Sequence, residues 1–279
     1  MSYHINMPQK LPAFFVSDFG PMPAFEEDDY TKALGFWGKK LGKPKAIIAM
    51  SGHWDTGSLA LEVSASSHPE TIHDYSGFPR EFYQKAYSCP GSPALARRVR
   101  DHLNQQGFEI RLNDTRGLDH GVWVPLSRLY PEADVPVVEL SVPAGQDPHK
   151  IIQIGEILSP LREENILLLA CGALIHNLGQ VHFFGKDDPP DDWASEFYQW
   201  LKEKFLASNT DDLSHFLEKA PHARLAAPSP EHFDPLFFFL GAGMREKSNI
   251  HFDSIYYGNG LLFIASIGHN LGDNHAKNN

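Results

Sequence analysis

The chain has only two cysteines among its 279 residues, too few for a disulfide framework. Cys89 and Cys171 therefore favour a reducing compartment, and we expect a cytoplasmic protein. Apolar runs of roughly 18 residues, the length that a membrane-spanning helix needs, are also missing. The first residues, Met1 to Asn6, lack the basic and then apolar pattern of a secretory signal, so no leader is predicted.

Clustered positive charge is missing as well. The chain has 24 Lys and Arg residues against 35 Asp and Glu residues, a formal net charge of −11, and no basic block. Because phosphate groups are bound by clustered cations, nucleic acid is not expected as a partner, and neither is an anionic membrane surface. With 42% hydrophobic residues the chain can bury a large core, and we expect one domain over residues 1–279. The oligomeric state is open, a homo-oligomer included.

Short apolar runs alternate with amphipathic stretches, which is typical of an α/β fold. Near-continuous apolar runs indicate strands that are covered on both faces, and they lie at residues 11–17, 45–51, 135–142 and 166–170. We therefore expect a central sheet, mostly parallel or mixed, that is flanked by helices.

Helical spacing of apolar residues predicts helices over residues 92–106 and 193–206. Asp191 or Asp192 is expected to cap the second helix, because a carboxylate accepts the free N–H groups of a first turn. Near the C-terminus, Gly258-Asn259-Gly260 separates two short apolar stretches and predicts a β-hairpin, since Asn and Gly tolerate positive φ.

Two histidines end apolar runs that are far apart in the chain. His53 follows residues 44–52, and His176 follows residues 166–175. Because ligand sites in open α/β sheets lie beyond the carboxyl ends of strands, this placement suggests a mononuclear metal site. Each histidine has another interpretation: His53 bonded to backbone at a strand end, and His176 paired with Asn177 as a helix cap.

Asp18 is a third candidate ligand, because it follows the apolar run 11–17. It precedes Gly20-Pro21, and an aspartate in that position is often a turn former. As a carboxylate ligand beside His53 and His176, it would complete the two-histidine, one-carboxylate arrangement of non-haem Fe(II) oxygenases.

His120 and His232 are further candidates. Gly117 and Gly121 flank His120 in a predicted polar loop, where it is either a proton-transfer group or an ordinary surface histidine. His232 precedes the apolar run 236–240, so its segment is either a rigid approach to a buried helix or simple helix-start chemistry.

Motif segments spread along nearly the whole chain occur in one family in this order: residues 11–17, 44–48, 51–54, 73–79, 116–121, 135–138, 176–178 and 232–233. With these segments the chain resembles the class III extradiol ring-cleavage dioxygenases of the LigB superfamily, in particular the 4,5-DOPA dioxygenase-like branch. The resemblance implies a non-haem Fe(II) enzyme that uses O₂ to open a catechol ring beside its two hydroxyls, and zinc is a second candidate occupant of the purified protein.

The resemblance also implies roles for the histidines. His53 and His176 match metal-ligand positions, and His232 matches a further histidine at or near the metal. His120 matches the histidine expected to act as acid and base. The partners implied are a small aromatic diol and O₂, with a ring-opened semialdehyde as the product.

Three residues are expected to contact the substrate. His73 and Tyr75 match a loop that lines the substrate pocket in the family. Arg116 or His73 is a candidate for holding a substrate carboxylate, while Arg116 could equally anchor its own loop.

The chain departs from the family pattern at Asp18, where the family usually has a histidine ligand in a Ser-His-Gly sequence. Aspartate can bind Fe(II), but its side chain is shorter than that of histidine. Two rival hypotheses therefore stand beside the dioxygenase. One is a zinc hydrolase, because the same nitrogen and oxygen ligands suit Zn²⁺. The other is a superfamily member that binds a metal or ligand without catalysis.

Overall fold

The computed structural model describes residues 10–56, 60–143 and 145–268. The N-terminal residues for which no secretory leader was predicted lie outside these ranges, and the single domain over residues 1–279 stays a prediction. Among the helices of the described residues, none has the length and apolar character needed to cross a membrane.

Eight strands in the described residues form one mixed sheet, with the order β4-β3-β5-β2-β6-β1-β8-β7. The four strands β5, β2, β6 and β1 run parallel, and the antiparallel hairpin of β7 and β8 extends the sheet beside β1. The predicted α/β fold with a mixed sheet and a C-terminal hairpin is therefore confirmed. The strands are β1 Ala13–Ser17, β2 Ala46–Asp55, β3 Leu61–Ser64, β4 Ile110–Asn113, β5 Val137–Val142, β6 Ile166–Gly172, β7 Ser248–Tyr256 and β8 Gly260–Ile267.

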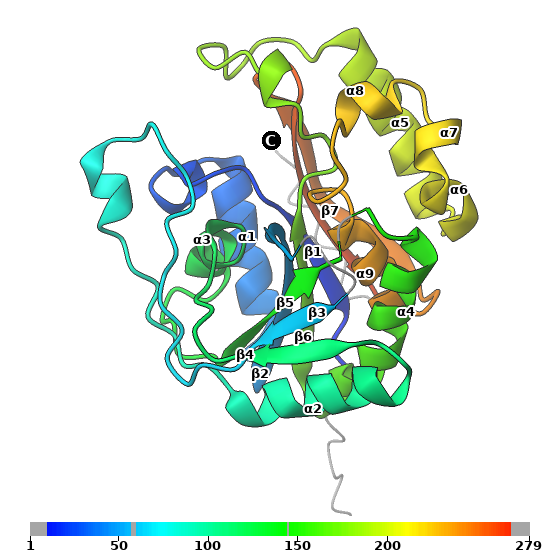
Figure 1. The fold of residues 1–279 in the computed structure, drawn as a ribbon. Coiled ribbons are helices and arrows are strands. Elements are labelled where there is room, and N and C mark those ends of the chain that lie inside the picture. The colour runs from blue at the N-terminus through cyan, green and yellow to red at the C-terminus, as the bar shows by residue number, and fades with distance from the viewer. Residues whose placement is uncertain (1–9, 57–59, 144, 269–279) are drawn as a thin grey trace, which may run out of the picture.

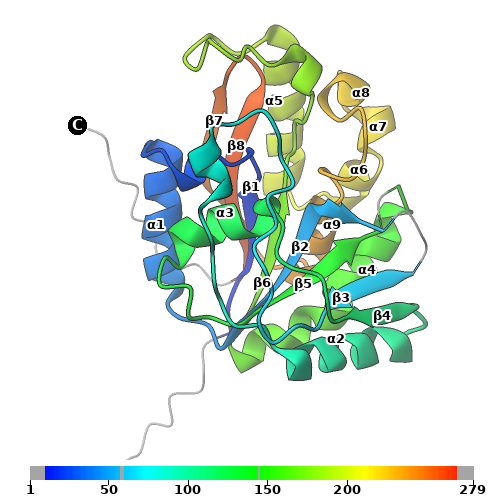
Figure 2. The same cartoon turned by 60° about the vertical axis from the view of Figure 1, so that its left-hand side comes forward.

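Helices cover both faces of the sheet. Figures 1 and 2 show α1 and α3 on one side, and α2, α4 and α9 on the other. The helices α5 to α8 lie together, and α5 packs against β7. The α-helices are α1 Asp29–Leu41, α2 Pro93–Gln105, α3 His120–Leu129, α4 Pro148–Leu158, α5 Asp192–Leu206, α6 Thr210–Ser214, α7 Phe216–Lys219, α8 Ala223–Ala226 and α9 Pro235–Gly243, and the 3₁₀ helices are η1 Met22–Ala24, η2 Arg80–Tyr83, η3 Ser159–Glu164 and η4 Leu178–Gln180.

The central strands are apolar at successive positions because each one contributes to two cores. Phe14 and Val16 belong to the core that contains α1 and α3, whereas Ala13 and Phe15 belong to the core with α4 and α9. Side chains alternate between the two faces of a strand, so a strand covered on both sides needs apolar residues throughout. Three of the four strands predicted from continuous runs, β1, β2 and β6, lead directly to candidate site residues.

Two local predictions were wrong in detail. Asp191 is the N-cap residue of α5, but its side chain accepts no hydrogen bond from the first turn and lies 3.5 Å from His182 Nε2 instead. In the hairpin turn, positive φ occurs at Tyr257 (54°) and Gly258 (80°), not at Asn259. The Asn259 amide instead donates to the carbonyl of Gln180 at 2.6 Å, which ties the turn to the segment after β6.

Candidate metal centre

The carboxyl ends of β1, β2 and β6 meet at one edge of the central sheet, where β6 lies between the other two strands. Asp18 follows β1 directly, His53 lies near the end of β2, and His176 follows β6. The backbone N–H of Asp18 donates to the carbonyl of Gly172 at 2.8 Å, which fixes the end of β1 against β6. The strand-end residues predicted from the sequence therefore reach the same edge.

His232 comes from the segment in front of α9, which packs against the ends of β2 and β6. Its carbonyl accepts the backbone N–H of Ala173 at 2.8 Å. A Cβ on Gly172 would lie 2.4 Å from that carbonyl, and a Cβ on Gly52 would lie 2.9 Å from His232 Nδ1. Glycine at both positions is therefore what allows this close approach. Every residue of α9 is buried, as the apolar run predicted.

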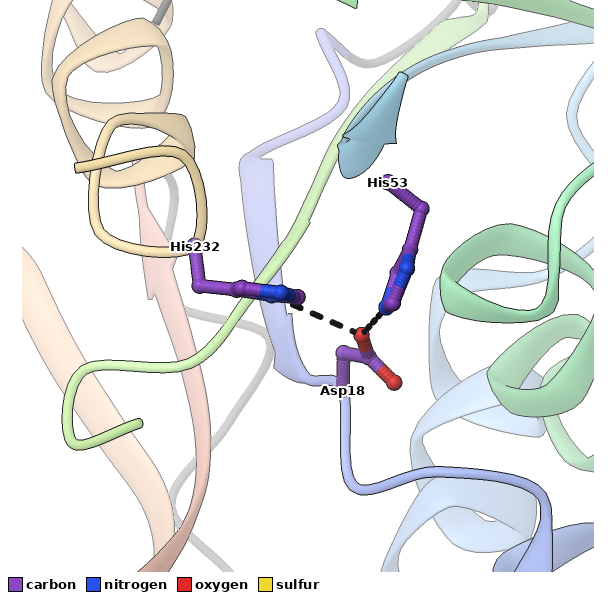
Figure 3. Close-up of side chains that lie close together, drawn as sticks. All are labelled: Asp18, His53 and His232. Atoms are coloured by element: carbon purple, nitrogen blue, oxygen red, sulfur yellow. Dashed lines mark hydrogen bonds and ion pairs between the residues drawn. The ribbon is translucent and has the colours of Figure 1, made fainter. Parts of the chain in front are cut away.

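Asp18, His53 and His232 form a cluster of possible metal ligands (Figure 3). Asp18 Oδ2 lies 2.5 Å from His53 Nε2 and 3.8 Å from His232 Nδ1. The other oxygen, Oδ1, accepts the backbone N–H of Gly20 at 3.3 Å, so Asp18 also forms the turn that its sequence position indicated. One carboxylate oxygen thus serves the turn and the other faces the two imidazoles.

Burial and neighbouring charges shift the pKa values of these three residues in different directions. Burial favours the neutral form of Asp18, but His53 and His120 outweigh it and hold the pKa of Asp18 below its usual range. Burial opposes a charge on His53, and the adjacent Asp18 carboxylate nevertheless raises the pKa of His53 to about 9. Burial and the neighbouring His176 lower the pKa of His232 to about 3, so His232 is neutral.

His232 Nδ1 is buried and has no hydrogen-bond partner among the residues that the structure describes. A buried imidazole nitrogen without a partner costs free energy, and a bound cation would satisfy it. Two imidazoles and one carboxylate are a donor set that Fe(II) and Zn²⁺ accept. The residues present therefore fit a divalent metal ion.

His176 lies beside His232 and belongs to a second group of possible ligands. Its ring stacks on that of His232, with centroids 3.7 Å apart, and it shares a second group of possible ligand atoms with His232 and Glu231. Burial lowers the pKa of His176, which keeps it neutral. His232, an accessory ligand according to the resemblance, is thus common to two groups, whereas His176 and His53 share none of the groups found in the described residues.

His120 is the first residue of α3, with Asp119 as the N-cap. Only 6% of its side chain is exposed, so the surface-loop alternative was wrong. Its Nε2 lies 3.6 Å from Asp18 Oδ1, and its ring centroid lies 3.9 Å from that of His53. A Cβ on Gly121 would lie 2.5 Å from Ser51 Oγ, so this glycine permits the approach of α3 to β2.

Arg116 lies in a buried charge network behind His120. Its Nη2 donates to Asp119 Oδ2 at 2.6 Å and to Glu139 Oε1 at 3.0 Å, and its guanidinium lies over the ring of Trp54. Burial and the nearby Asp119 raise the pKa of Glu139 well above its usual range. These contacts are those of a residue that anchors its own loop, the alternative left open by the sequence, and contact with a substrate stays a prediction.

His73 and Tyr75 use their polar ends within their own loop. The hydroxyl of Tyr75 donates to the carbonyl of Phe82 at 2.6 Å, and His73 Nε2 lies 2.8 Å from the carbonyl of Lys85. The ring of Tyr75 meets the His120 ring edge-on, with centroids 5.4 Å apart. Any contact of Tyr75 with a bound aromatic molecule is therefore expected through its ring.

Two acidic residues at the site were missed by sequence reasoning. Asp74 lies between the two loop residues that were singled out, and its carboxylate contacts His53 and His120. Glu231 precedes His232 directly and offers a ligand atom to the second group. A carboxylate next to a candidate histidine was the available signal in both cases.

Comparison with known proteins connects this geometry to one family. The family described as "Catalytic LigB subunit of aromatic ring-opening dioxygenase" matches residues 12–261. Two similar proteins are named 4,5-DOPA dioxygenase extradiol: that of Portulaca grandiflora is 38% identical over 91% of this chain and 94% of its own length, and that of Escherichia coli K12 is 34% identical over 93% and 95%.

A solved structure has the same fold. The crystal structure of the uncharacterized protein JW3007 from Escherichia coli K12 matches with a TM-score of 0.78 and 32% sequence identity. The match covers 92% of this chain and 100% of that chain.

Proposed function

This chain belongs to the LigB family of aromatic ring-opening dioxygenases, and we propose that it is an Fe(II)-dependent enzyme that uses O₂ to cleave a catechol-type substrate beside its two hydroxyls. The observation that carries the proposal is the cluster of Asp18, His53 and His232. It supplies two imidazoles and one carboxylate at the carboxyl edge of the sheet, where α/β proteins place their ligands.

Asp18 supports metal binding although the family usually has histidine there. Its carboxylate is buried and lies against both imidazoles, so a cation bound there would gain a negatively charged ligand. A bound Fe(II) ion would lower the pKa of a coordinated hydroxyl and supply the redox chemistry that O₂ requires. His176 packs against His232 and is the proposed fourth ligand or support of this set.

His120 is the proposed acid and base. Its Nδ1 is held by Asp74 Oδ1 at 2.8 Å, which leaves Nε2 directed toward the ligand cluster. A general base must lie within hydrogen-bond reach of the proton that it takes. From this position Nε2 would accept the proton of a substrate hydroxyl and would donate it to another oxygen atom at a later step. The imidazole ring of His120 would stay in place throughout.

The substrate would lie against the loop that carries His73 and Tyr75. Aromatic rings of this loop pack on one another, including Tyr75 on Tyr83 at 5.2 Å and on Phe78 at 5.5 Å. Such rings offer an apolar, flat contact for an aromatic diol.

Oxygen uptake by anaerobically iron-loaded protein, measured with a panel of catechols, tests the proposal. We expect one O₂ consumed for each catechol and a yellow ring-opened product. Uptake without substrate loss, or no uptake with any catechol despite a full iron content, would refute it. A zinc hydrolase would turn over its substrate without O₂, and a binding protein would turn over nothing.

A further inference from the structure

Glu139 is a fully buried acidic residue in β5, and the proposed reaction gives it no part. Its Oε1 accepts a hydrogen bond from Arg116 Nη2 at 3.0 Å, and its Oε2 accepts the backbone N–H of Asp119 at 3.2 Å. Asp119 is the N-cap of α3 and directly precedes His120. Glu139 therefore holds the backbone at the point where α3 begins.

Asp119 connects the start of α3 to two strands of the sheet. Its Oδ1 accepts the hydroxyl of Ser51 at 2.8 Å and the backbone N–H of Val122 at 3.3 Å, and Ser51 lies on β2. Its own backbone N–H donates to Glu139 on β5. The position of His120 relative to the metal centre therefore depends on the contacts of the residue that precedes it.

The two buried carboxyl groups of Glu139 and Asp119 share one cation. Arg116 Nη2 lies 2.6 Å from Asp119 Oδ2 and 3.0 Å from Glu139 Oε1, and among the described residues it is the one cation that pairs with either group. The side chains of Glu139 and Asp119 also form a hydrogen bond with each other. Two carboxylates cannot form such a bond, because neither has a hydrogen to donate. One of the two groups is therefore a carboxylic acid.

The contacts assign this hydrogen to Glu139. Asp119 accepts a hydroxyl, a backbone N–H and the shorter of the two Arg116 contacts, and donors of this kind stabilise a charged carboxylate. Glu139 accepts only two contacts of 3.0 Å or more. The titratable groups that face it in the described residues are Asp119, Arg116 and the Cys171 thiol of β6, and burial raises the pKa of Glu139.

We propose that Glu139, as a carboxylic acid, is a positioning residue that fixes the start of α3 against β5 and thereby holds His120 at the metal centre. The proposal rests on the proposed function for the part that His120 takes in the reaction. The contact of Glu139 with the start of α3 is independent of that reaction. A general base works only within hydrogen-bond reach of its proton, and a misplacement of about 1 Å costs about 100-fold in rate.

Two substitutions of Glu139 separate positioning from simple burial. Glu139→Gln keeps an uncharged side chain of the same shape, whose NH₂ group donates to Asp119 and whose oxygen still accepts an N–H. Glu139→Met keeps the length of the side chain and removes both functions. Ser141→Ala is the matched control on the same strand, because it removes a buried hydroxyl whose contact is with β3, where it accepts the backbone N–H of Glu62 at 2.8 Å.

Steady-state kinetics of the iron-loaded variants test the effect on the reaction. We expect Glu139→Met to lose kcat about 10- to 100-fold with little change in KM, and Glu139→Gln to stay within about threefold of the wild type. Ser141→Ala should be less stable in denaturant and should keep its kcat. An unchanged kcat in Glu139→Met, or an equal loss in Glu139→Gln and Glu139→Met, would overturn the proposal.

Infrared spectroscopy tests the carboxylic acid without any turnover. Zinc-loaded wild-type protein with side-chain ¹³C-labelled glutamate should show the C=O stretch of a protonated carboxyl group at neutral pH, and Glu139→Gln should lack it. A wild-type spectrum without that band would overturn the proposal.

Amide hydrogen exchange tests the contact with α3. The amide of Asp119 should exchange slowly in the wild type, and residues 119–122 should exchange faster in Glu139→Met but not in Ser141→Ala. Fast exchange of the Asp119 amide in the wild type would overturn the proposal even if Glu139→Met does not fold. If the wild type cleaves no catechol, the proposed function fails, while the infrared and exchange results still decide the role of Glu139.

Discussion

Gly52→Ala tests whether the close packing of the His232 segment on β2 builds the metal centre. Gly52 has no positive φ, so alanine meets no backbone strain there. The added Cβ would lie 2.8 Å from the carbonyl oxygen of Glu231 and 2.9 Å from both Cα and Nδ1 of His232. Real Cβ atoms essentially never approach other atoms so closely, and two of these atoms belong to the backbone, so the segment must shift away from β2.

Overpacking of this kind costs about 1–3 kcal/mol of the free energy of unfolding. Moving His232 away from Asp18 and His53 should also raise the Kd for zinc about 10-fold or more, because supporting contacts of ligands are worth that much. Unfolding in denaturant measures the first quantity on metal-free protein, and competition with a chelator measures the second.

Gly35→Ala is the matched control, since it makes the same change inside α1. Its Cβ would meet only the carbonyl of Arg128, at an ordinary 3.8 Å, and alanine is favoured over glycine in a helix by about 1 kcal/mol. We expect this variant to be slightly more stable and to bind zinc normally. If Gly52→Ala matches the wild type in stability and in zinc affinity, the packing argument for His232 is wrong.

Three further substitutions test individual side chains. His120→Phe should lower kcat strongly while the metal content stays near that of the wild type, and normal turnover on a good catechol would remove His120 from the reaction. Asp18→Ala should weaken zinc binding, and an unchanged zinc Kd would leave Asp18 as a turn former only. Arg116→Met should cost about 3–5 kcal/mol in unfolding by denaturant, because it leaves the buried carboxylate of Asp119 without its cation and Glu139 without a hydrogen-bond donor. A raised KM without loss of stability would instead place Arg116 at the substrate.

Sequence patterns predicted the features that depend on neighbouring residues in the chain. The apolar run 166–170 predicted a strand because a doubly covered strand is apolar at every position, and β6 includes that run. The position of His53 after such a run predicted the correct edge of the sheet. The hairpin of β7 and β8 was likewise predicted, from the turn sequence Gly258-Asn259-Gly260.

Features that depend on contacts across the fold were not predictable in this way. Nothing in the residues around His120 indicates that Asp74 contacts it, because α2 and β4 separate the two residues in the chain. The predicted cap of α5 was wrong for the same reason, because the Asp191 side chain lies near His182 and not against the first turn of the helix. The local sequence of His232 left its role open, and only the packing of its segment against β2 and β6 brings it to Asp18.

The dependence of His232 on Gly52 and Gly172 has a consequence for the order in which the protein assembles. Asp18 and His53 are synthesised early, but His232 reaches them only after more than 170 further residues have been made and α9 has docked. Closing so long a loop carries a large entropic cost, so this contact is expected among the last to form. A metal ion that needs all three side chains therefore stabilises the finished fold and no shorter intermediate, and its binding free energy acts on the final docking step alone.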